Sequence, residues 1–354
     1  MVTWRRAPDQ PSGRVNYQRK MAQTLPRESL SVCMIVRATE TMLERALRSV
    51  HPISDQIVVA VDPGEAPESA AARADVARVG EILDRYGAEW FLGQSPLRVG
   101  FDAARNVTLD RARGDWVLWI DADEELEYGE RLLKFLQPNP YDAYSVAQMH
   151  LSTEPPGMLK TDFPTRLFRR GSGMRFVGIV HEHPCYSEVA PPKNVMLLPD
   201  NIAIMHVGYA TERVRLDRFR RNIGLMQRDI RAYPNRELGK LLWVRDQTYL
   251  ARFGGYATAQ SRAYAQGAIN LWRELLRAGS VRFAVEALPF ITETSVMLHG
   301  PQSVTRWRFA LDVLNGAGGR GEILDAAFPT AADAEQLTAL LTQDRYKPFM
   351  QRYR

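Results

Sequence analysis

Two aspartates, Asp121 and Asp123, follow directly after the apolar run 116–120 and precede Glu124 and Glu125. The apolar run predicts a buried strand, and in open α/β sheets ligands bind beyond the carboxyl ends of the strands. Carboxylates at positions i and i+2 are the hard oxygen ligands that suit Mg²⁺ or Mn²⁺, and such an ion usually keeps positions for substrate phosphates. Alternatively, these carboxylates only stabilise the N-terminus of a following helix.

The elements that would position these aspartates alternate between strands and helices. Continuous apolar content predicts buried strands over 30–36, 56–61, 89–92 and 116–120. Apolar residues at helical spacing predict helices over 40–50, 66–86 and 101–113, the last closed by Gly114. This alternation predicts an α/β fold, with a mostly parallel sheet covered by helices on both faces.

The pattern changes after Tyr141. Short strand-like pieces over 143–149, 165–169 and 201–206 lie between Pro- and Gly-rich loops and predict an antiparallel extension that completes a site. Beyond, helices are predicted over 213–233, 237–253, 257–278, 281–298, 303–316 and 331–341, as in stacked hairpins without a clean period. We therefore expect an N-terminal arm over 1–29, an α/β domain over 30–208 and an all-α region over 209–354.

Size and composition indicate the class of protein. A chain of 354 residues is long for one core, and its 45% hydrophobic and 25% charged residues are typical of a soluble globular protein. No apolar run approaches the ~20 residues that span a bilayer, and the N-terminus lacks the apolar segment of a signal peptide. The two cysteines, Cys33 and Cys185, are far apart, and Cys33 is expected to be a buried thiol. Together these features predict a cytoplasmic setting without disulfides.

The chain is basic, with a net charge of +5, and only six of its 46 basic residues are lysine. The planar guanidinium of arginine suits phosphate better than the ammonium of lysine does, but biased genomic composition is the larger contributor to this excess. Seven arginines recur along the helix predicted over 213–233: Arg213, Arg215, Arg218, Arg220, Arg221, Arg228 and Arg231. This face could bind an anionic acceptor or simply be a solvated helix surface.

Several blocks, in order, resemble the family 2 glycosyltransferases of the GT-A fold. They are residues 30–36 with 43–50, 55–62, 101–106, 112–124, 166–169 leading to His181 and Glu182, and 206–209. The resemblance covers residues 30–210, and the block that ends at Glu124 is the most specific. This branch often carries a C-terminal helical region, in agreement with the helices predicted here.

The resemblance implies a nucleotide-sugar donor whose diphosphate leaving group is neutralised by Mn²⁺ or Mg²⁺. Asp123 would ligate the metal directly, and Asp121 would reach the ribose or a metal-bound water. His206, at a predicted strand end, is the candidate for a further ligand; the alternative is a structural histidine.

Other residues are assigned to the donor. Asp62 ends the second strand, where its carboxylate could accept hydrogen bonds from the base or ribose. The family uses the arginine at the position of Arg105 at the donor; alternatively Arg105 is a surface arginine paired with Asp102. Arg37, at the end of the first strand, is assigned to the same site.

The loops after the first two strands depart from the family pattern. The usual Asn-Glu is replaced by Ala38 and Thr39, and the usual Ser-Thr-Asp by the segment 64–67. Both departures fall where base and ribose bind, so a UDP-sugar is expected only by default.

An inverting enzyme needs a general base for the acceptor hydroxyl. Glu182 is the first candidate and Asp162 the second; alternatively Glu182 orients His181 or His183. The sequence thus predicts a metal-dependent, inverting glycosyltransferase acting on a hydroxyl of a saccharide, a protein or a nucleic acid such as DNA with a hydroxymethylated pyrimidine. The alternatives are a nucleotidyltransferase, although segment 37–40 lacks its usual Gly-rich basic loop, and a non-catalytic helical scaffold.

Overall fold

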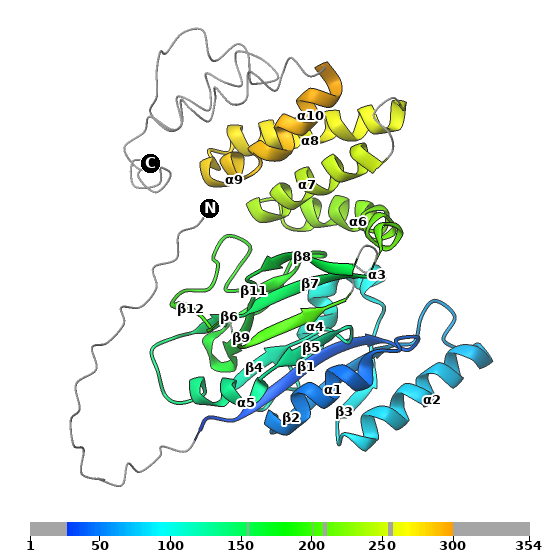
Figure 1. Ribbon diagram of the computed structural model, residues 1–354, viewed down its shortest axis with the longest axis vertical. Coiled ribbons are helices and arrows are strands. Elements are labelled where there is room, and N and C mark those ends of the chain that lie inside the picture. Colours follow the sequence, from blue (N-terminus) through cyan, green and yellow to red (C-terminus); the bar gives the residue numbers. More distant parts are fainter. Residues whose placement is uncertain (1–26, 154–155, 200, 208–210, 254–257, 300–354) are drawn as a thin grey trace, which may run out of the picture.

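The computed structural model describes residues 27–153, 156–199, 201–207, 211–253 and 258–299 (Figure 1). An α/β domain is followed by a stack of helices that lies against one side of it (Figure 1). The central sheet has the strand order β12-β6-β9-β4-β1-β2-β3. Its strands are β1 (Leu30–Arg37), β2 (Gln56–Asp62), β3 (Glu89–Leu92), β4 (Trp116–Trp119), β6 (Ala143–Ser145), β9 (Thr165–Arg169) and β12 (Val195–Leu197).

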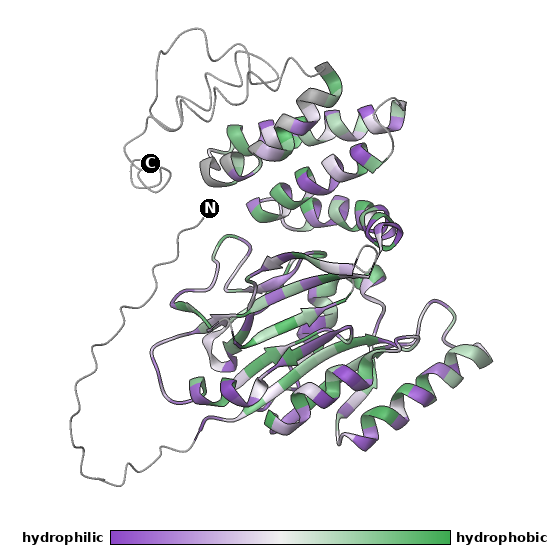
Figure 2. Cartoon of the chain, viewed as in Figure 1, coloured by the Kyte–Doolittle hydropathy of each residue, from purple (hydrophilic) through white to green (hydrophobic). Residues whose placement is uncertain are grey.

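The strands β1 to β4 are parallel, as the sequence pattern predicted, whereas β9 runs antiparallel to both β4 and β6. Successive side chains of a strand point to opposite faces of a sheet. Accordingly, Val32 and Met34 of β1 enter one core cluster while Cys33 enters another, and on β4 Leu118 and Val117 divide in the same way. In Figure 2, β1 is largely hydrophobic, whereas α2 mixes hydrophobic and hydrophilic residues. The sheet is therefore buried on both faces.

Helices cover both faces. Leu47 of α1 and Leu83 of α2 pack into one core cluster, and Leu109 of α4 packs into the other. The helices of this domain are α1 (Leu43–Val50), α2 (Ala70–Arg85), α3 (Pro96–Val99), α4 (Phe101–Leu109) and α5 (Gly129–Leu132), with 3-10 helices over His51–Ile53, Leu133–Phe135 and Arg170–Ser172.

A second sheet begins directly after the Asp-Ala-Asp segment. Its order is β5-β13-β7-β8, and a separate pair, β10 with β11, forms near its side. In this sheet His206 of β13 stands opposite Glu124 on one neighbour and His150 on the other. The strands are β5 (Glu124–Glu127), β7 (Ala147–Thr153), β8 (Pro156–Asp162), β10 (Arg175–Val177), β11 (His183–Cys185) and β13 (Ala203–His206).

The C-terminal helices form their own apolar core around Trp272, Leu275 and Val244. Thr211 and Thr258 cap two of these helices by accepting a hydrogen bond from a backbone N–H, as N-cap residues do. The helices are α6 (Glu212–Ala232), α7 (Glu237–Phe253), α8 (Ala259–Arg277), α9 (Val281–Glu286) and α10 (Leu288–His299).

Two predicted elements are split. The strand predicted over 143–149 is interrupted at Val146 and supplies β6 and β7 to different sheets. The helix predicted over 281–298 breaks at Ala287 into α9 and α10, because Pro289 lacks an N–H and suits only the first turn of a helix. The strands β5, β8, β10, β11 and β12 were not predicted.

Parts of the predicted organisation lie outside the described residues: almost all of the arm over 1–29, the helices over 303–316 and 331–341, and the boundary at 208/209. Cys33 is buried, as predicted, and Cys185 is a second, separate buried thiol. Among the described helices, none has the length and apolarity required to cross a bilayer.

Replacing Leu118 by alanine should lower the free energy of unfolding by about 2 to 5 kcal/mol. The side chain is fully buried in the core cluster on one face of the central sheet, and its loss leaves a cavity. Leu159→Ala, at a site that is 45% exposed, is the matched control and should change it by less than about 0.5 kcal/mol. Urea denaturation of both variants checks this, and equal losses would contradict the assigned core.

Candidate active site

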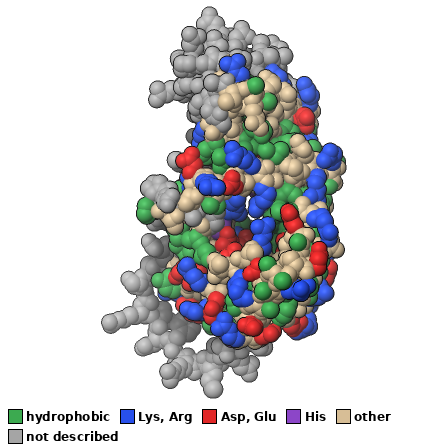
Figure 3. Space-filling view, turned by 90° about the vertical axis from the view of Figure 1, so that its right-hand side faces the viewer, with side chains coloured by type: hydrophobic (Ala, Val, Ile, Leu, Met, Phe, Trp, Pro, Cys, Tyr) green, Lys and Arg blue, Asp and Glu red, His purple; other side chains and the backbone are tan. Residues whose placement is uncertain are grey.

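The carboxyl ends of β1, β2 and β4 meet at one cavity. Arg37 and Asp62 are register partners at the ends of β1 and β2, and Asp121 follows the end of β4. The cavity measures about 630 Å³, within the range of pockets that enclose small-molecule ligands. Figure 3 shows a hollow bordered by basic and acidic side chains. Six of the predicted site residues line the cavity: Arg37, Asp62, Arg105, Asp121, Asp123 and Glu182.

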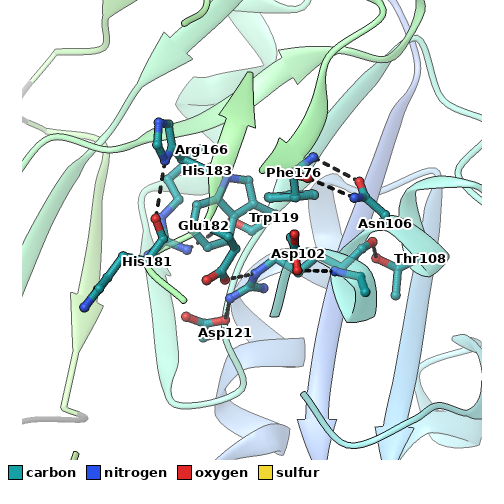
Figure 4. A network of polar contacts seen from close by, with 12 residues as sticks. Asp102, Asn106, Thr108, Trp119, Asp121, Arg166, Phe176, His181, Glu182 and His183 are labelled. Atoms are coloured by element: carbon teal, nitrogen blue, oxygen red, sulfur yellow. Dashed lines mark hydrogen bonds and ion pairs between the residues drawn. The ribbon is translucent and has the colours of Figure 1, made fainter. Parts of the chain in front are cut away.

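Arg105 of α4 is the centre of the site, between Asp121 and Glu182, which lie close together in Figure 4. Its Nη2 donates to Asp121 Oδ1 at 2.6 Å, its Nε donates to Glu182 Oε1, and its guanidinium lies 4.4 Å from the ring centroid of Trp119. Burial disfavours the charge of Arg105, but the two carboxylates outweigh burial and raise its pKa. The alternative pairing with Asp102 is wrong, because Asp102 accepts a hydrogen bond from the Tyr233 hydroxyl instead.

Asp121 is held from two sides. Burial raises its pKa, but the nearby Arg105 and Arg166 lower it to about 2. Its backbone N–H donates to Glu124 Oε2 at 2.8 Å, and the buried Glu124 accepts from Arg166 at 2.7 Å and from Gln148. Glu124 and Arg166 both lie inside the motif blocks, but no separate role was predicted for either of them.

Asp123 begins a row of four polar side chains that ends at Asp162. Asp123 Oδ2 lies 3.4 Å from His206 Nε2, His206 Nδ1 lies 2.8 Å from His150 Nδ1, and His150 Nε2 lies 3.0 Å from Asp162 Oδ2. Both histidines are buried. Asp162 also contacts Lys160. Asp162 and His206 are not among the described residues that line the cavity, whereas Asp123 is. The two histidines therefore separate Asp162 from the cavity.

Two carboxylates flank the pair of histidines. Burial lowers the pKa of His150, although Asp162 opposes the shift. The Nε2 atom of His150 lies 3.0 Å from Asp162, and the Nε2 atom of His206 lies 3.4 Å from Asp123. The wider contact, at Asp123, brings a carboxylate and an imidazole nitrogen together, and both are common metal ligands.

The donor chemistry of Asp123 and His206 fits a divalent ion. A carboxylate suits Mg²⁺ and Mn²⁺, and an imidazole nitrogen favours the transition metal. In the parts of the chain that the structure describes, no three His, Cys, Asp or Glu side chains are grouped closely enough to hold a metal ion by themselves. Asp121 faces Arg105 instead. The protein thus offers a two-residue corner rather than a complete set of ligands.

Asp62 organises the loop after β2. Its Oδ1 accepts from Gly64 N at 2.9 Å, and its backbone carbonyl accepts from Ala38 N at 2.9 Å. Gly64 has a φ of 88°, in the left-handed region that favours glycine. The two unusual loops are therefore bound to each other at the edge of the cavity.

Asn106 has a structural role. Its amide side chain donates to the carbonyl of Phe176 and accepts from the N–H of Phe176, both at 2.9 Å (Figure 4). These two hydrogen bonds tie α4 to β10. The strand is thereby placed next to Arg105 and close to the loop that carries Glu182.

The helical region contributes to the cavity. Four residues of α6 line it: Arg218, Phe219, Arg221 and Asn222. Arg228 instead donates to the carbonyls of Leu97 and Arg98. The arginine pattern of α6 alone could not distinguish these uses, because they depend on how the helix is docked.

His181 and His183 neighbour Glu182 along the chain. His181 Nε2 lies 3.1 Å from Asp246 Oδ2, and His183 Nδ1 lies 3.4 Å from the carbonyl of His181. Glu182 itself is bound to Arg105. Its alternative role, orienting these histidines, therefore has less geometric support than a role in the cavity.

The charge of Asp121 should stabilise the fold over a definite pH range. Because its folded pKa, about 2, lies below that of an unfolded aspartate, roughly 3.9, this stabilisation is present above about pH 4 and is lost as the pH falls toward 2. The difference in unfolding free energy between wild type and Asp121→Asn should be constant from about pH 7 to 5 and shrink below about pH 4.

Urea denaturation across this range measures the difference. The control is Asp110→Asn, at a largely exposed carboxylate paired with Arg175, which should show little difference at any pH. A difference for Asp121→Asn that persists undiminished at about pH 3 would contradict the lowered pKa.

Comparisons with known proteins identify the α/β domain. Residues 31–187 match the family described as Glycosyl transferase family 2. A TPR repeat-containing protein of Synechococcus elongatus is 31% identical over 193 residues, which cover 52% of this chain and 44% of that protein. The SPbeta prophage-derived glycosyltransferase SunS of Bacillus subtilis is 28% identical over 137 residues, covering 38% of this chain and 32% of SunS.

The chain therefore spans less than half the length of these curated relatives. Among solved structures, S. aureus TarS 1–349 in complex with UDP-GlcNAc has a TM-score of 0.45 at 14% identity, covering 84% of this chain and 95% of that one. The family match spans the central strands, Asp121, Asp123 and Glu182. Residues 31–187 thus match the family that the motifs resemble.

Proposed function

We propose that this protein transfers a sugar from a nucleotide-sugar donor to an acceptor hydroxyl in an inverting reaction. The observation that carries the proposal is the buried bridge from Asp121 through Arg105 to Glu182, because it joins the predicted donor side of the cavity to a candidate base. The family match favours glycosyl transfer over nucleotidyl transfer or a purely scaffolding role.

The donor would lie along the ends of β1 and β2. Arg37 and Asp62 line that part of the cavity and would contact the nucleotide, with a UDP-sugar as the default donor. Asp123 and His206 would hold Mn²⁺ or Mg²⁺, which when bound neutralises charge on the diphosphate leaving group. Asp121, fixed by Arg105, would orient the donor from the same edge.

Glu182 is proposed as the general base that accepts the proton of the acceptor hydroxyl as the hydroxyl oxygen attacks the sugar. It lines the cavity, whereas Asp162 lies behind His150 and His206. We therefore assign Asp162 a different role, in which it orients His150 and through it His206.

The acceptor would enter beside α6. Arg218 and Arg221 line the cavity there and would favour an acceptor with phosphate groups, such as a nucleic acid that carries a hydroxylated base. The family match supports sugar transfer without specifying the acceptor, so a neutral saccharide and a protein are the alternatives to be tested.

Mn²⁺ together with the correct nucleotide-sugar should raise the stability of the protein, because a ligand at 100 times its Kd contributes about 2.7 kcal/mol. Thermal unfolding with a panel of nucleotide-sugars, each with and without Mn²⁺, measures this. If no nucleotide-sugar stabilises the protein, the proposed donor class is wrong.

Asp123→Ala should lower turnover of that donor by about 100-fold or more, because it removes charge stabilisation worth several kcal/mol, while the circular dichroism spectrum stays unchanged. Asp110→Ala replaces an exposed aspartate of the same domain and should retain full turnover. Unimpaired turnover by the Asp123 variant would refute the metal assignment.

An anionic acceptor should bind less tightly as salt is added, since phosphate contacts are lost to competing ions. Arg218→Ala and Arg221→Ala should each raise the KM for a hydroxymethylated oligonucleotide by roughly tenfold. Arg213→Ala, on the exposed part of the same helix, is the control. Steady-state kinetics at several salt concentrations test this, and salt indifference would point to a neutral acceptor instead.

A further inference from the structure

We propose that the helical region is part of the catalytic apparatus, with Arg236 and Asp246 acting as positioning residues for the loop that carries Glu182. This inference rests on the proposed role of Glu182. The loop comprises residues 178–182 and connects β10 to β11. Figure 4 shows His181, Glu182 and His183 on this stretch of chain, with Glu182 close to Asp121. Glu182 accepts a hydrogen bond from Arg105, which also donates to Asp121.

The loop has a conformation that needs support from outside. His181 has a φ of 54° and Gly178 a φ of 118°. A non-glycine residue in the left-handed region carries a conformational cost and persists only where surrounding contacts determine it. The backbone that leads up to Glu182 is thus not held by its own preference.

Arg236, between α6 and α7, supplies much of that support. Its Nη1 donates to the Val180 carbonyl at 3.2 Å, and its Nη2 donates to the His181 carbonyl. A Cβ added to Gly178 would lie 2.4 Å from Arg236 Cζ, so the guanidinium packs against the bare backbone of that glycine. One buried side chain therefore holds three residues of the loop.

Asp229 of α6 completes this contact. Its Oδ1 accepts from Ile179 N at 2.7 Å, and its Oδ2 accepts from Arg236 at 2.8 Å. Asp229 and Arg236 are 1% and 2% exposed. A buried ion pair costs desolvation and is weak evidence for stability, so its better-supported use is to specify one conformation. Here that conformation is the path of the loop.

Asp246 of α7 holds the residue directly before Glu182. Its Oδ2 lies 3.1 Å from His181 Nε2, and its Oδ1 accepts from Arg245 at 2.7 Å. Burial raises the pKa of Asp246, but Arg245 and His181 lower it to about 2, so the carboxylate remains charged. The His181 side chain is consequently anchored on the helical region.

The same helices also anchor α4, since the Tyr233 hydroxyl donates to Asp102, one turn before Arg105. Both partners of the Arg105–Glu182 contact are thus attached to the helical region. If the loop shifts, Arg105 loses one of its two carboxylates inside a buried site, where an unpaired charge is costly. The helices therefore set the position of Glu182 relative to Asp121.

The test is Arg236→Met, with Arg252→Met as the matched control. Arg252 lies on α7 and pairs with Glu293 at a partly exposed site away from the loop. We expect Arg236→Met to lower kcat by about 100-fold, as a small misplacement of a catalytic group can, and to leave donor affinity within about twofold. Hydrogen exchange should speed up in residues 178–183 of this variant, and the control should match wild type in all three measurements.

The inference is overturned if Arg236→Met leaves kcat or the exchange of residues 178–183 unchanged, or if donor affinity falls in parallel with kcat. If wild type turns over no donor, the proposed function fails, and the exchange measurement alone then decides the positioning role. Should Arg236→Met not fold, Asp246→Ala and Asp246→Asn replace it. Asp246→Asn, which still accepts a hydrogen bond from His181, should rescue most of the kcat that Asp246→Ala loses, and equal kcat in the two would overturn the inference.

Discussion

A single buried guanidinium, that of Arg105, is the interaction on which the rest of the site depends. It bonds to Asp121 after β4 and to Glu182 before β11, which are 61 positions apart in the chain. Burial of a charge is costly unless it is paired and hydrogen-bonded, so both carboxylates must stay in place for the fold to keep Arg105 inside. The surrounding structure keeps the guanidinium and its partners in place. Trp119 stacks against the guanidinium, and Asn106 ties α4 to β10.

The second sheet positions Asp123 and His206 in the same way. Because β5 starts immediately after Asp123 and pairs with β13, the register brings Glu124 opposite His206 and Asp123 next to it. The buried Glu124–Arg166 pair then fixes the turn from the other side. Polar groups buried at this density need partners, and in the row from Asp123 to Asp162 two histidines lie between the two carboxylates. Asp162, at the end of this row, contacts His150.

The helical region and the α/β domain share their polar interior. Asp229, Tyr233 and Arg236 come from α6 and the residues just after it, yet their partners are Ile179, Asp102 and the loop carbonyls. The cavity is bounded by both parts. The α/β domain thus obtains one wall of its cavity, and contacts to the loop over 178–182, from helices that follow it in the chain.

Much of the fold could be predicted from the sequence by itself, because local patterns carry it. The apolar runs predicted the central strands, the helical spacing predicted the covering helices, and Asp121-Ala-Asp123 at a strand end predicted an acidic site edge. Only the tertiary structure decided the partners of each charge. Arg218 and Arg228 lie on the same helix, and nothing local distinguishes Arg218, which lines the cavity, from Arg228, which donates to carbonyls of α3. The roles of Arg236 and Asp246 were equally hidden, because a buried ion pair is defined by residues distant in sequence, and its formation depends on how whole elements dock.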